Sequence, residues 1–319
     1  MKLIESKVEI IEQEPGLEGI YKQIEKAGRL CYKSEDKICE GSAEKMVENL
    51  MKRGHGSPLE HGTVYLYFKV YIGRKKKNMP TDCVDTLDAF ELMKALFNNP
   101  YSRKNLISDK SYRHYYITTN FRVLYEADKL DFLKYICEPT EHHEKRITVK
   151  MNCSIGISRE FNRHRANSVC ETSTRYCNYS KDKFGNEITF VIPEWVKDRI
   201  NETASYNNND DLARTPYTDA VFDSRMTSDK AISIWLNDLK TTESDYMDLI
   251  NEGLKPQEAR SVLSLDTATE VMYTAYSSDW EHFISLRTAV GAHPDARILA
   301  NNLRWLLESN SLINCTNGN

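Results

Sequence analysis

Residues 158–176 are the part of the chain that most restricts its fold and its chemistry. These nineteen residues contain four arginines, one histidine and two glutamates, whereas the whole chain has a net charge of −4. Guanidinium groups bind phosphate through paired hydrogen bonds, and the serines and threonines of the same stretch can complete the shell. If the run is helical, Arg159 and Arg163 share one face. The composition favours a site for an anionic ligand, with a solvated helix face held by internal ion pairs as the alternative.

The overall composition is that of a soluble protein. The chain has 319 residues, enough for one large domain or two small ones, with 40% hydrophobic and 28% charged residues. No run approaches the roughly 20 apolar residues that a membrane helix needs, and residues 1–10 are typical of a first strand and not of a signal peptide. The eight cysteines form no Cys-x-x-Cys pair, which predicts reduced thiols in a cytoplasmic protein. The slightly acidic balance argues against general nucleic-acid binding.

Several kinds of catalytic site have no support in the sequence. No neighbouring pattern marks Cys170 as an activated nucleophile, and Ser173 lacks an elbow of glycines. The chain has neither a phosphate-binding loop nor a Gly-x-Gly-x-x-Gly motif. Cys170, Cys177 and His164 match no common zinc spacing, so we expect no metal. The remaining arginines, hydroxyls and carboxylates can bind anions and polarise carbonyls, and they leave difficult carbon chemistry to a cofactor.

Hydrophobic periodicity predicts the main elements. Helical spacing of apolar residues predicts helices over residues 16–32, 42–53, 84–98, 127–137 and 227–253. β-Branched and aromatic runs predict strands over residues 1–12, 62–71, 146–154 and 188–192. We expect strand 146–154 to pair with 63–71. A further helix is expected from about Ile157 to about Asn167, and residues 200–226 are expected to form a surface loop.

The residue order in the arginine-rich stretch resembles the signature of the flavin-dependent thymidylate synthases. The family pattern is Arg-His-Arg, seven residues, then Ser. Here Arg163-His164-Arg165 is followed after seven residues by Ser173, and then by Arg175-Tyr176. The segment His55-Gly-Ser-Pro-Leu-Glu-His61 resembles the family's second motif, Gly-His, a few residues, then Glu-His.

The C-terminal third carries the rest of the resemblance. Pro256-Gln-Glu-Ala-Arg-Ser-Val-Leu263 resembles the family's Ala-Arg-x-x-Leu segment, and residues 271–276 resemble the strand that follows it. Residues 279–287 open the next helix and end in Leu-Arg, the family's place for its catalytic arginine. The resemblance covers about 15–72 and 146–310. It implies an α+β fold, with an antiparallel or mixed sheet flanked by helices, in a single domain over residues 1–319 that has an insertion at about 73–145.

The resemblance also implies an activity. Members of the family reduce FAD with NADPH, take a one-carbon unit from methylenetetrahydrofolate and deliver it to C5 of dUMP, giving dTMP. It implies a homotetramer whose site is shared between subunits. It assigns Arg287 as the catalytic residue. The cofactor-binding residues that it implies are His55, Ser57, Arg163, His164, Arg165, Glu171, Tyr276 and His282. The substrate-binding residues that it implies are Glu160, Arg163, Ser173, Thr174, Arg175, Arg260 and Arg287.

Two carboxylates depart from the family pattern. Glu160 stands where compact members usually have Gln near the nucleotide, and Glu270 stands where some have Arg. A carboxylate repels a phosphate at close range, by about 1 kcal/mol at roughly 4 Å in water. Flavin-dependent C5 modification of another pyrimidine nucleotide is therefore one alternative function. A non-enzymatic nucleotide- or RNA-binding module and a cysteine- or zinc-dependent hydrolase are alternatives from other classes.

Overall fold

The computed structural model describes residues 1–73, 83–96, 99–206 and 229–313. The strands are β1 (Lys2–Ile4), β2 (Lys7–Ile11), β3 (Thr63–Tyr71), β4 (Arg103–Ser108), β5 (Tyr112–Asn120), β6 (Arg146–Ser154), β7 (Ser168–Glu171), β8 (Thr189–Val191) and β9 (Ala268–Tyr276). The helices are α1 (Gly16–Tyr32), α2 (Ser42–Arg53), α3 (Gly56–Leu59), α4 (Thr86–Ala95), α5 (Phe121–Glu126), α6 (Ile155–Phe161), α7 (Glu194–Tyr206), α10 (Lys230–Asn251), α11 (Pro256–Ala259), α12 (Ser277–Arg287) and α13 (Pro294–Ser309).

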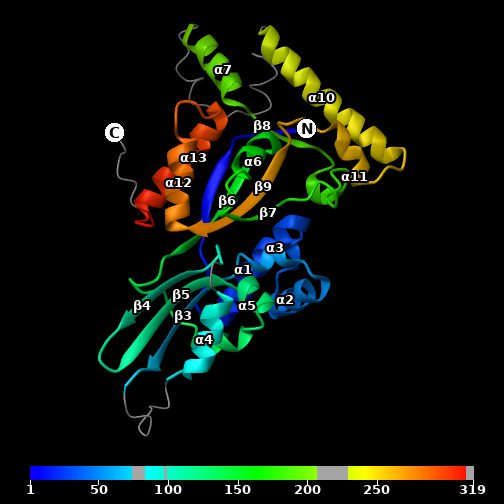
Figure 1. The fold of residues 1–319 in the computed structure, drawn as a ribbon. Helices are drawn as coiled ribbons and strands as arrows, with labels where there is room; N and C mark the ends of the chain where they lie inside the picture. Colours follow the sequence, from blue (N-terminus) through cyan, green and yellow to red (C-terminus); the bar gives the residue numbers. More distant parts are fainter. Residues whose placement is uncertain (74–82, 97–98, 207–228, 314–319) are drawn as a thin grey trace.

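Two antiparallel sheets lie one above the other in Figure 1. The upper sheet has the strand order β2-β6-β9-β7, and the lower sheet has the order β3-β5-β4. A short parallel pair, β1 with β8, lies beside the upper sheet. Antiparallel sheets flanked by helices confirm the predicted α+β class. The predicted pairing of residues 146–154 with 63–71 is wrong, because β6 pairs with β2 and β9 whereas β3 pairs with β5.

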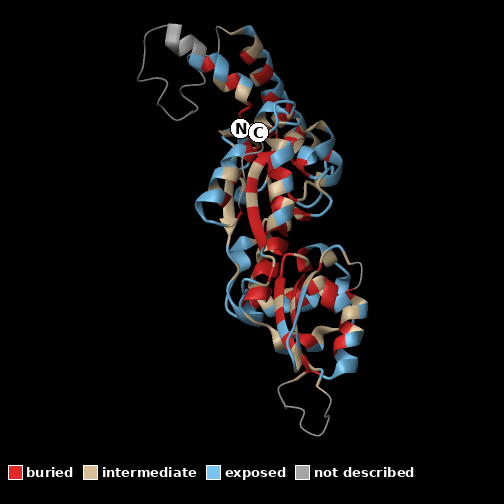
Figure 2. Cartoon of the chain, turned by 60° about the vertical axis from the view of Figure 1, so that its left-hand side comes forward, coloured by how far each residue is buried: buried red, intermediate tan, exposed pale blue. Residues whose placement is uncertain are grey.

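Helices cover both faces of the upper sheet. Alternate residues of a strand point to opposite faces, and in β9 Val271 and Tyr273 pack with α12 and α13 while Met272 packs with Ala27 and Leu30 of α1. Buried residues accordingly follow the central strands in Figure 2. The upper sheet is therefore a middle layer between α12/α13 and α1.

Helix α1 joins the two sheets. Its apolar residues recur on one face, as an amphipathic helix requires. Ile20 and Ile24 belong to the core beneath the lower sheet, and Ala27 and Leu30 belong to the core against the upper one. Gly62, which precedes β3, lies so close to Ile24 that a Cβ there would be 2.7 Å from Cδ1 of that side chain. The first half of α1 and the start of β3 are therefore fixed to the same core.

Two predicted helices and one predicted loop differ from the structure. Helix α6 stops at Phe161, so Arg163, His164 and Arg165 lie beyond it. Helix α5 begins at Phe121, before the predicted helix at 127–137, where the structure has a 3-10 turn over Leu130–Tyr135. Residues 200–206, expected in a loop, continue α7, and the rest of that expected loop lies outside the described residues.

Candidate functional site

A basic cavity of about 800 Å³ opens between α6, the segment after β7, and α11. Three arginines that come from these separate elements line it, and hydroxyl groups fill the space between them. The charged residues are Arg159, Arg175, Arg260 and Glu171, and the hydroxyl residues are Ser158, Thr172, Ser173, Thr174, Ser261 and Ser264. Guanidinium and hydroxyl donors converging on one cavity form the donor set that a phosphate group requires.

The segment after β7 is held in place through its backbone. Strand β7 pairs with β9, and the amide of Thr172 extends this pairing by donating to the carbonyl oxygen of Glu270 (2.9 Å). The amide of Ser173 then donates to the carbonyl oxygen of Cys31 at the end of α1 (3.0 Å). Arg260 reaches across the cavity and donates to the hydroxyl of Thr174 (3.2 Å). The cavity wall is therefore anchored on both the sheet and α1.

Glu171 lies in the cavity with one carboxylate oxygen engaged. The hydroxyl of Ser158 donates to its Oε1 at 2.8 Å. Ser158 is itself buried on α6, whose N-terminus is capped by the hydroxyl of Ser154. This contact ties the arginine-bearing helix α6 to strand β7.

Arg287 lies in a second cluster, outside the cavity lining. Its Nε donates to Nε2 of His164 (2.9 Å), and its Nη1 forms an ion pair with Glu160 (3.0 Å). Nη2 also donates to the backbone oxygen of Glu160. Glu160, on α6, therefore binds the guanidinium of Arg287, the residue to which the family resemblance assigns the catalytic role.

His164 is uncharged in this arrangement. Burial lowers its pKa, and the positive charge of Arg287 and then the nearby His282 lower it further, to about 4. The imidazole packs on Phe283 with ring centroids 4.6 Å apart. Because Nε2 accepts a hydrogen bond from Arg287, the ring proton is on Nδ1. His164 therefore orients Arg287 as a neutral acceptor.

The remaining predicted flavin residues lie on the surface around these two groups. Arg163, Arg165 and His282 are exposed, and within the described residues no hydrogen bond or ion pair engages the two arginines. His55 is exposed at the start of α3. The hydroxyl of Ser57 donates to the backbone oxygen of Val169 (2.8 Å) and lies 3.4 Å from the sulfur of Cys170. Ser57 therefore connects the His55 segment to β7.

Tyr276 lies elsewhere. Its side chain is 2% exposed, and its hydroxyl contacts the backbone oxygens of Thr118 (2.8 Å) and Tyr101 (2.9 Å). The guanidinium of Arg103 stacks 4.4 Å from its ring centroid. The phenol lines neither the basic cavity nor the Arg287 cluster. In this conformation it joins β9 to the lower sheet.

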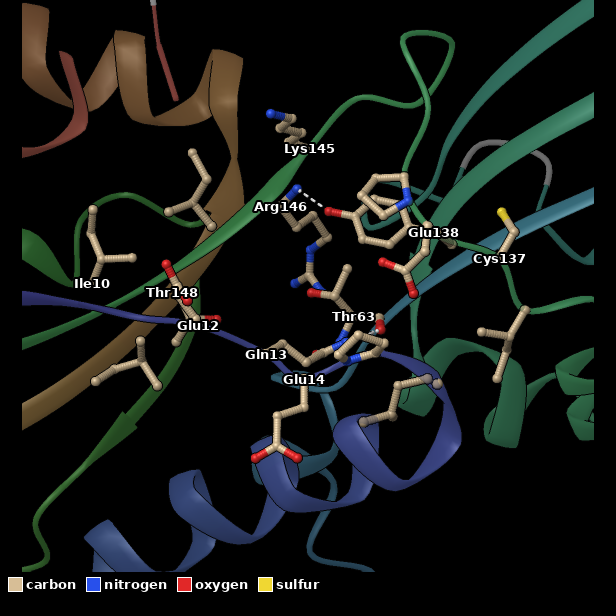
Figure 3. A pocket seen from close by; sticks show the side chains of 18 of the residues that line it. Ile10, Glu12, Gln13, Glu14, Thr63, Cys137, Glu138, Lys145, Arg146 and Thr148 are labelled. Atoms are coloured by element: carbon tan, nitrogen blue, oxygen red, sulfur yellow. Dashed lines mark hydrogen bonds between the residues drawn. The ribbon is translucent and has the colours of Figure 1, made fainter. Parts of the chain in front are cut away.

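A second cavity of about 300 Å³ lies between the two sheets (Figure 3). Arg146 lines it and is 8% exposed. Its guanidinium donates to the backbone oxygen of Glu60 (3.0 Å) and to the hydroxyl of Ser168 (3.0 Å), and its amide donates to the hydroxyl of Tyr65 (3.0 Å). Arg146 therefore links β6, β7 and the start of the lower sheet. Nothing in the sequence distinguished this arginine from a surface one.

The structure brings the predicted substrate residues Ser173, Thr174, Arg175 and Arg260 into one cavity, together with the predicted cofactor residue Glu171. It places Glu160, His164 and Arg287 in a separate cluster. Arg159 lines the cavity but was absent from the predicted site. Its position four residues before Arg163 suggested a shared helix face, but the early end of α6 separates the two.

Other classes of feature find no support among the described residues. No group of three or more His, Cys, Asp or Glu side chains there is arranged to hold a metal ion. Among the helices of the described segments, none combines the length and apolar character needed to cross a membrane.

On this α+β fold, the guanidinium and hydroxyl donors of the cavity form a site whose chemistry suits an anionic ligand. The family model described as "Thymidylate synthase complementing protein" matches residues 15–73 and 126–309. The chain belongs to this family and is a flavin-dependent enzyme of the thymidylate synthase class. The family and enzyme class predicted from the sequence are confirmed.

The similarity to known proteins covers most of the chain. A flavin-dependent thymidylate synthase from Aquifex aeolicus (strain VF5) is 21% identical over 335 residues, covering 91% of this chain and 95% of the relative. Crystal structures of the UMP/dUMP methylase PolB from Streptomyces cacaoi cover 97% of this chain. The complex with 5-Br dUMP is 16% identical, with a TM-score of 0.40 and 93% of that chain covered. The complex with 5-Br UMP is 14% identical, with a TM-score of 0.42 and 92% covered.

Proposed function

We propose that this enzyme methylates dUMP at C5 to give dTMP, with FAD as its cofactor, NADPH as reductant and methylenetetrahydrofolate as carbon donor. The observation that carries the proposal is the cavity in which Arg159, Arg175 and Arg260 converge with hydroxyl groups. A nucleotide monophosphate is a dianion near neutral pH and suits this donor set. The membership of the chain in the family supplies the rest of the reaction.

The remaining predicted flavin residues have the donor chemistry that a flavin dinucleotide requires. Arg163 and Arg165 are exposed guanidinium groups, suited to a pyrophosphate, and Ser57 and His164 present polar atoms suited to ring edges. When bound there, the flavin supplies the redox and one-carbon transfer chemistry. The side chains bind and orient the ligands and exclude water from them.

Arg287 has the central role in the proposed mechanism. A guanidinium at the edge of the uracil ring stabilises the ionised pyrimidine and so raises the electron density at C5, which is electrostatic preorganisation. His164 fixes the direction of Arg287 through its Nε. For Arg287 to reach the base, Glu160 must release it, so substrate binding exchanges one anion for another at this guanidinium.

We also propose that the enzyme is a homotetramer whose active site is completed by a second subunit, and that residues 73–145 are an insertion in a single domain. The separation of Arg287 from the cavity within one chain supports a shared site. Sedimentation velocity of the purified protein tests the assembly, and a monomer that retains full activity would contradict it.

The function is tested by incubating the purified, flavin-loaded protein with methylenetetrahydrofolate, NADPH and either dUMP or dCMP, and by measuring the product mass. We expect dTMP from dUMP. A methylated product from dCMP alone would instead assign another pyrimidine nucleotide as the substrate. Colourless protein that cannot be reconstituted with FAD would contradict the proposal.

The Arg287→Ala variant tests the assigned role within the same assay. We expect dTMP formation to fall to the background rate while FAD remains bound, because the variant removes the group that stabilises the ionised base and leaves the flavin residues intact. Arg297→Ala, at a half-buried position of α13 outside both the basic cavity and the Arg287 cluster, is the control and should retain wild-type turnover. Retained turnover in Arg287→Ala would show that another group performs this step.

A further inference from the structure

A second basic pocket, of about 500 Å³, lies beside His55 and has no role in the mechanism described so far. It is formed by the end of α1, the 3-10 turn Glu35–Lys37, the end of α2, and Lys183. Five of its lining residues are cationic, and Asp36 is the one carboxylate among them. These cations are Arg29, Lys33, Lys37, Arg53 and Lys183. The chain as a whole is acidic, so this local excess of positive charge requires an explanation.

Part of this charge is neutralised within the protein. Arg29 pairs with the buried Glu25 (2.9 Å), and Lys33 pairs with Glu270. Lys37 and Arg53 are exposed, and within the described residues no carboxylate forms an ion pair with either of them. The exposed Lys183 has no ion pair within the described residues either, but its ammonium donates to the backbone oxygens of Tyr32 (3.4 Å) and Lys33 (3.2 Å). Lys37 and Arg53 are therefore the two cations most available to an external anion.

An aromatic pair lies between this pocket and the nucleotide cavity. Tyr32 lines the basic pocket, and its ring centroid is 5.4 Å from that of Tyr176, which directly follows the cavity residue Arg175. Tyr176 is 59% exposed. The hydrogen bond from the amide of Ser173 to the carbonyl oxygen of Cys31 (3.0 Å) holds the two segments together. A ligand running from the cavity toward His55 would meet aromatic faces first and cations after them.

We infer that the His55 pocket binds the anionic tail of the folate co-substrate, in which an aromatic aminobenzoyl group is followed by one or more glutamates. The order of contacts in the protein, aromatic pair and then unpaired cations, matches the order of groups in that molecule. Additional glutamates bring additional carboxylates within reach of Lys37 and Arg53. This assignment rests on the proposed function, because it requires folate to be the carbon donor.

The test compares methylenetetrahydrofolate carrying one glutamate with the form carrying several. We expect the wild-type enzyme to have a KM about three- to tenfold lower for the longer form at low ionic strength, since two exposed ion pairs contribute roughly this much. The advantage should shrink as salt is added, because exposed charges are screened. The Lys37→Ala/Arg53→Ala double variant should lose the advantage and keep its KM for the short form.

Lys45→Ala/Lys52→Ala is the matched control, because it removes the same charge from exposed positions of α2 that do not line the pocket. This variant should behave as the wild type. An unchanged preference for the longer folate in Lys37→Ala/Arg53→Ala would overturn the inference. A rise in the KM for NADPH alone, or a loss of bound FAD, would also overturn it, by assigning the pocket to the phosphates of those molecules.

Equilibrium dialysis of the two folates against the flavin-loaded protein separates this inference from the proposed function. Turnover with no effect of tail length would reject the pocket assignment and leave the function standing. Tighter binding of the longer folate without any dTMP would support the pocket and reject the function.

Discussion

At the scale of single residues, the contact that most affects the chemistry is the ion pair between Glu160 and Arg287. In the proposed mechanism this guanidinium must bind the substrate, so Glu160 competes with the substrate for it. Compact members of the family usually have Gln at this position. The carboxylate is about half exposed, at 49%, so its interaction with Arg287 is partly screened by solvent.

We predict that Glu160→Gln lowers the KM for dUMP by about three- to tenfold, the size expected when one partly exposed charge pair no longer competes with an anionic substrate. The amide keeps the shape and can still accept a hydrogen bond from Arg287. Steady-state kinetics with dUMP measures the effect. The control is Glu252→Gln, which removes an exposed charge after α10. A higher KM in Glu160→Gln would mean that the carboxylate itself binds the substrate.

The other unusual carboxylate, Glu270, is compensated within the protein. Burial opposes its ionisation, but the hydrogen bond from Lys33 and the charges of Lys33 and Lys150 outweigh burial and lower its pKa. A glutamate on β9 is therefore compatible with a basic site nearby, because two lysines neutralise it before it can repel a ligand.

At the scale of elements, local patterns were sufficient for the long amphipathic helices α1, α2 and α10, but not for α5 and α6. Helices α1 and α2 have the predicted bounds, and α10 lies within its predicted range, because an amphipathic repeat is written in neighbouring residues. The partner of β6 could not be predicted this way. The apolar alternation of residues 146–154 is compatible with pairing to either β3 or β9. One actual partner, β9, lies more than 100 residues further along the chain, and tertiary packing selects it.

For the site, too, local sequence patterns were informative and tertiary contacts could not be predicted. The family motifs identified Glu171, Ser173, Thr174, Arg175 and Arg260 of the cavity and the residues of the Arg287 cluster, since motif spacing is a property of the sequence, but they did not identify Arg159. They could not show that Glu160 holds Arg287, because that depends on a tertiary contact between α6 and α12. Nor did they show that α6 ends before Arg163. Arg146 was missed because a buried arginine and an exposed one look alike in sequence.

The contact between α1 and the start of β3 leads to a stability prediction. An added methyl in Gly62→Ala would lie 2.7 Å from Cδ1 of Ile24 and 2.9 Å from Cγ2 of Ile20, both fully buried and β-branched. Overpacking of this kind costs about 1–3 kcal/mol. Urea unfolding at fixed protein concentration should show that loss. Gly291→Ala, where a Cβ would meet nothing within 4 Å, should change the free energy of unfolding by less than about 0.5 kcal/mol. Equal effects in both variants would contradict this packing.

At the scale of the whole molecule, two uncharged histidines connect stability to pH. His61 is 0% exposed, and burial and then the charge of Arg146 lower its pKa from 6.5 to about 3. The pKa of His164 is lowered to about 4. Below pH 6.5 the unfolded chain takes up protons at these rings that the folded chain does not, so folding stability falls with pH until the folded pKa values are reached.

We predict that the free energy of unfolding decreases between pH 6.5 and pH 4, by up to about 1.4 kcal/mol per pH unit for each of the two histidines. Chemical unfolding at several pH values measures the slope. His61→Gln should have a shallower slope than the wild type, and His293→Gln, at an exposed position, should not. If His61→Gln kept the wild-type slope, the buried imidazole would not be the source.

The contacts of Arg146 require an arginine at this position, and another cationic residue would not replace it. Its guanidinium donates to the backbone oxygen of Glu60, before β3, with one nitrogen and to the hydroxyl of Ser168, on β7, with another. A single ammonium group on a flexible stem has no rigid fork to span two acceptors that come from different elements. To transfer the upper sheet and its site to a shorter protein, a designer would have to keep Arg146, Glu60 and Ser168 together. The alternative is to redesign the contact between the two sheets without them.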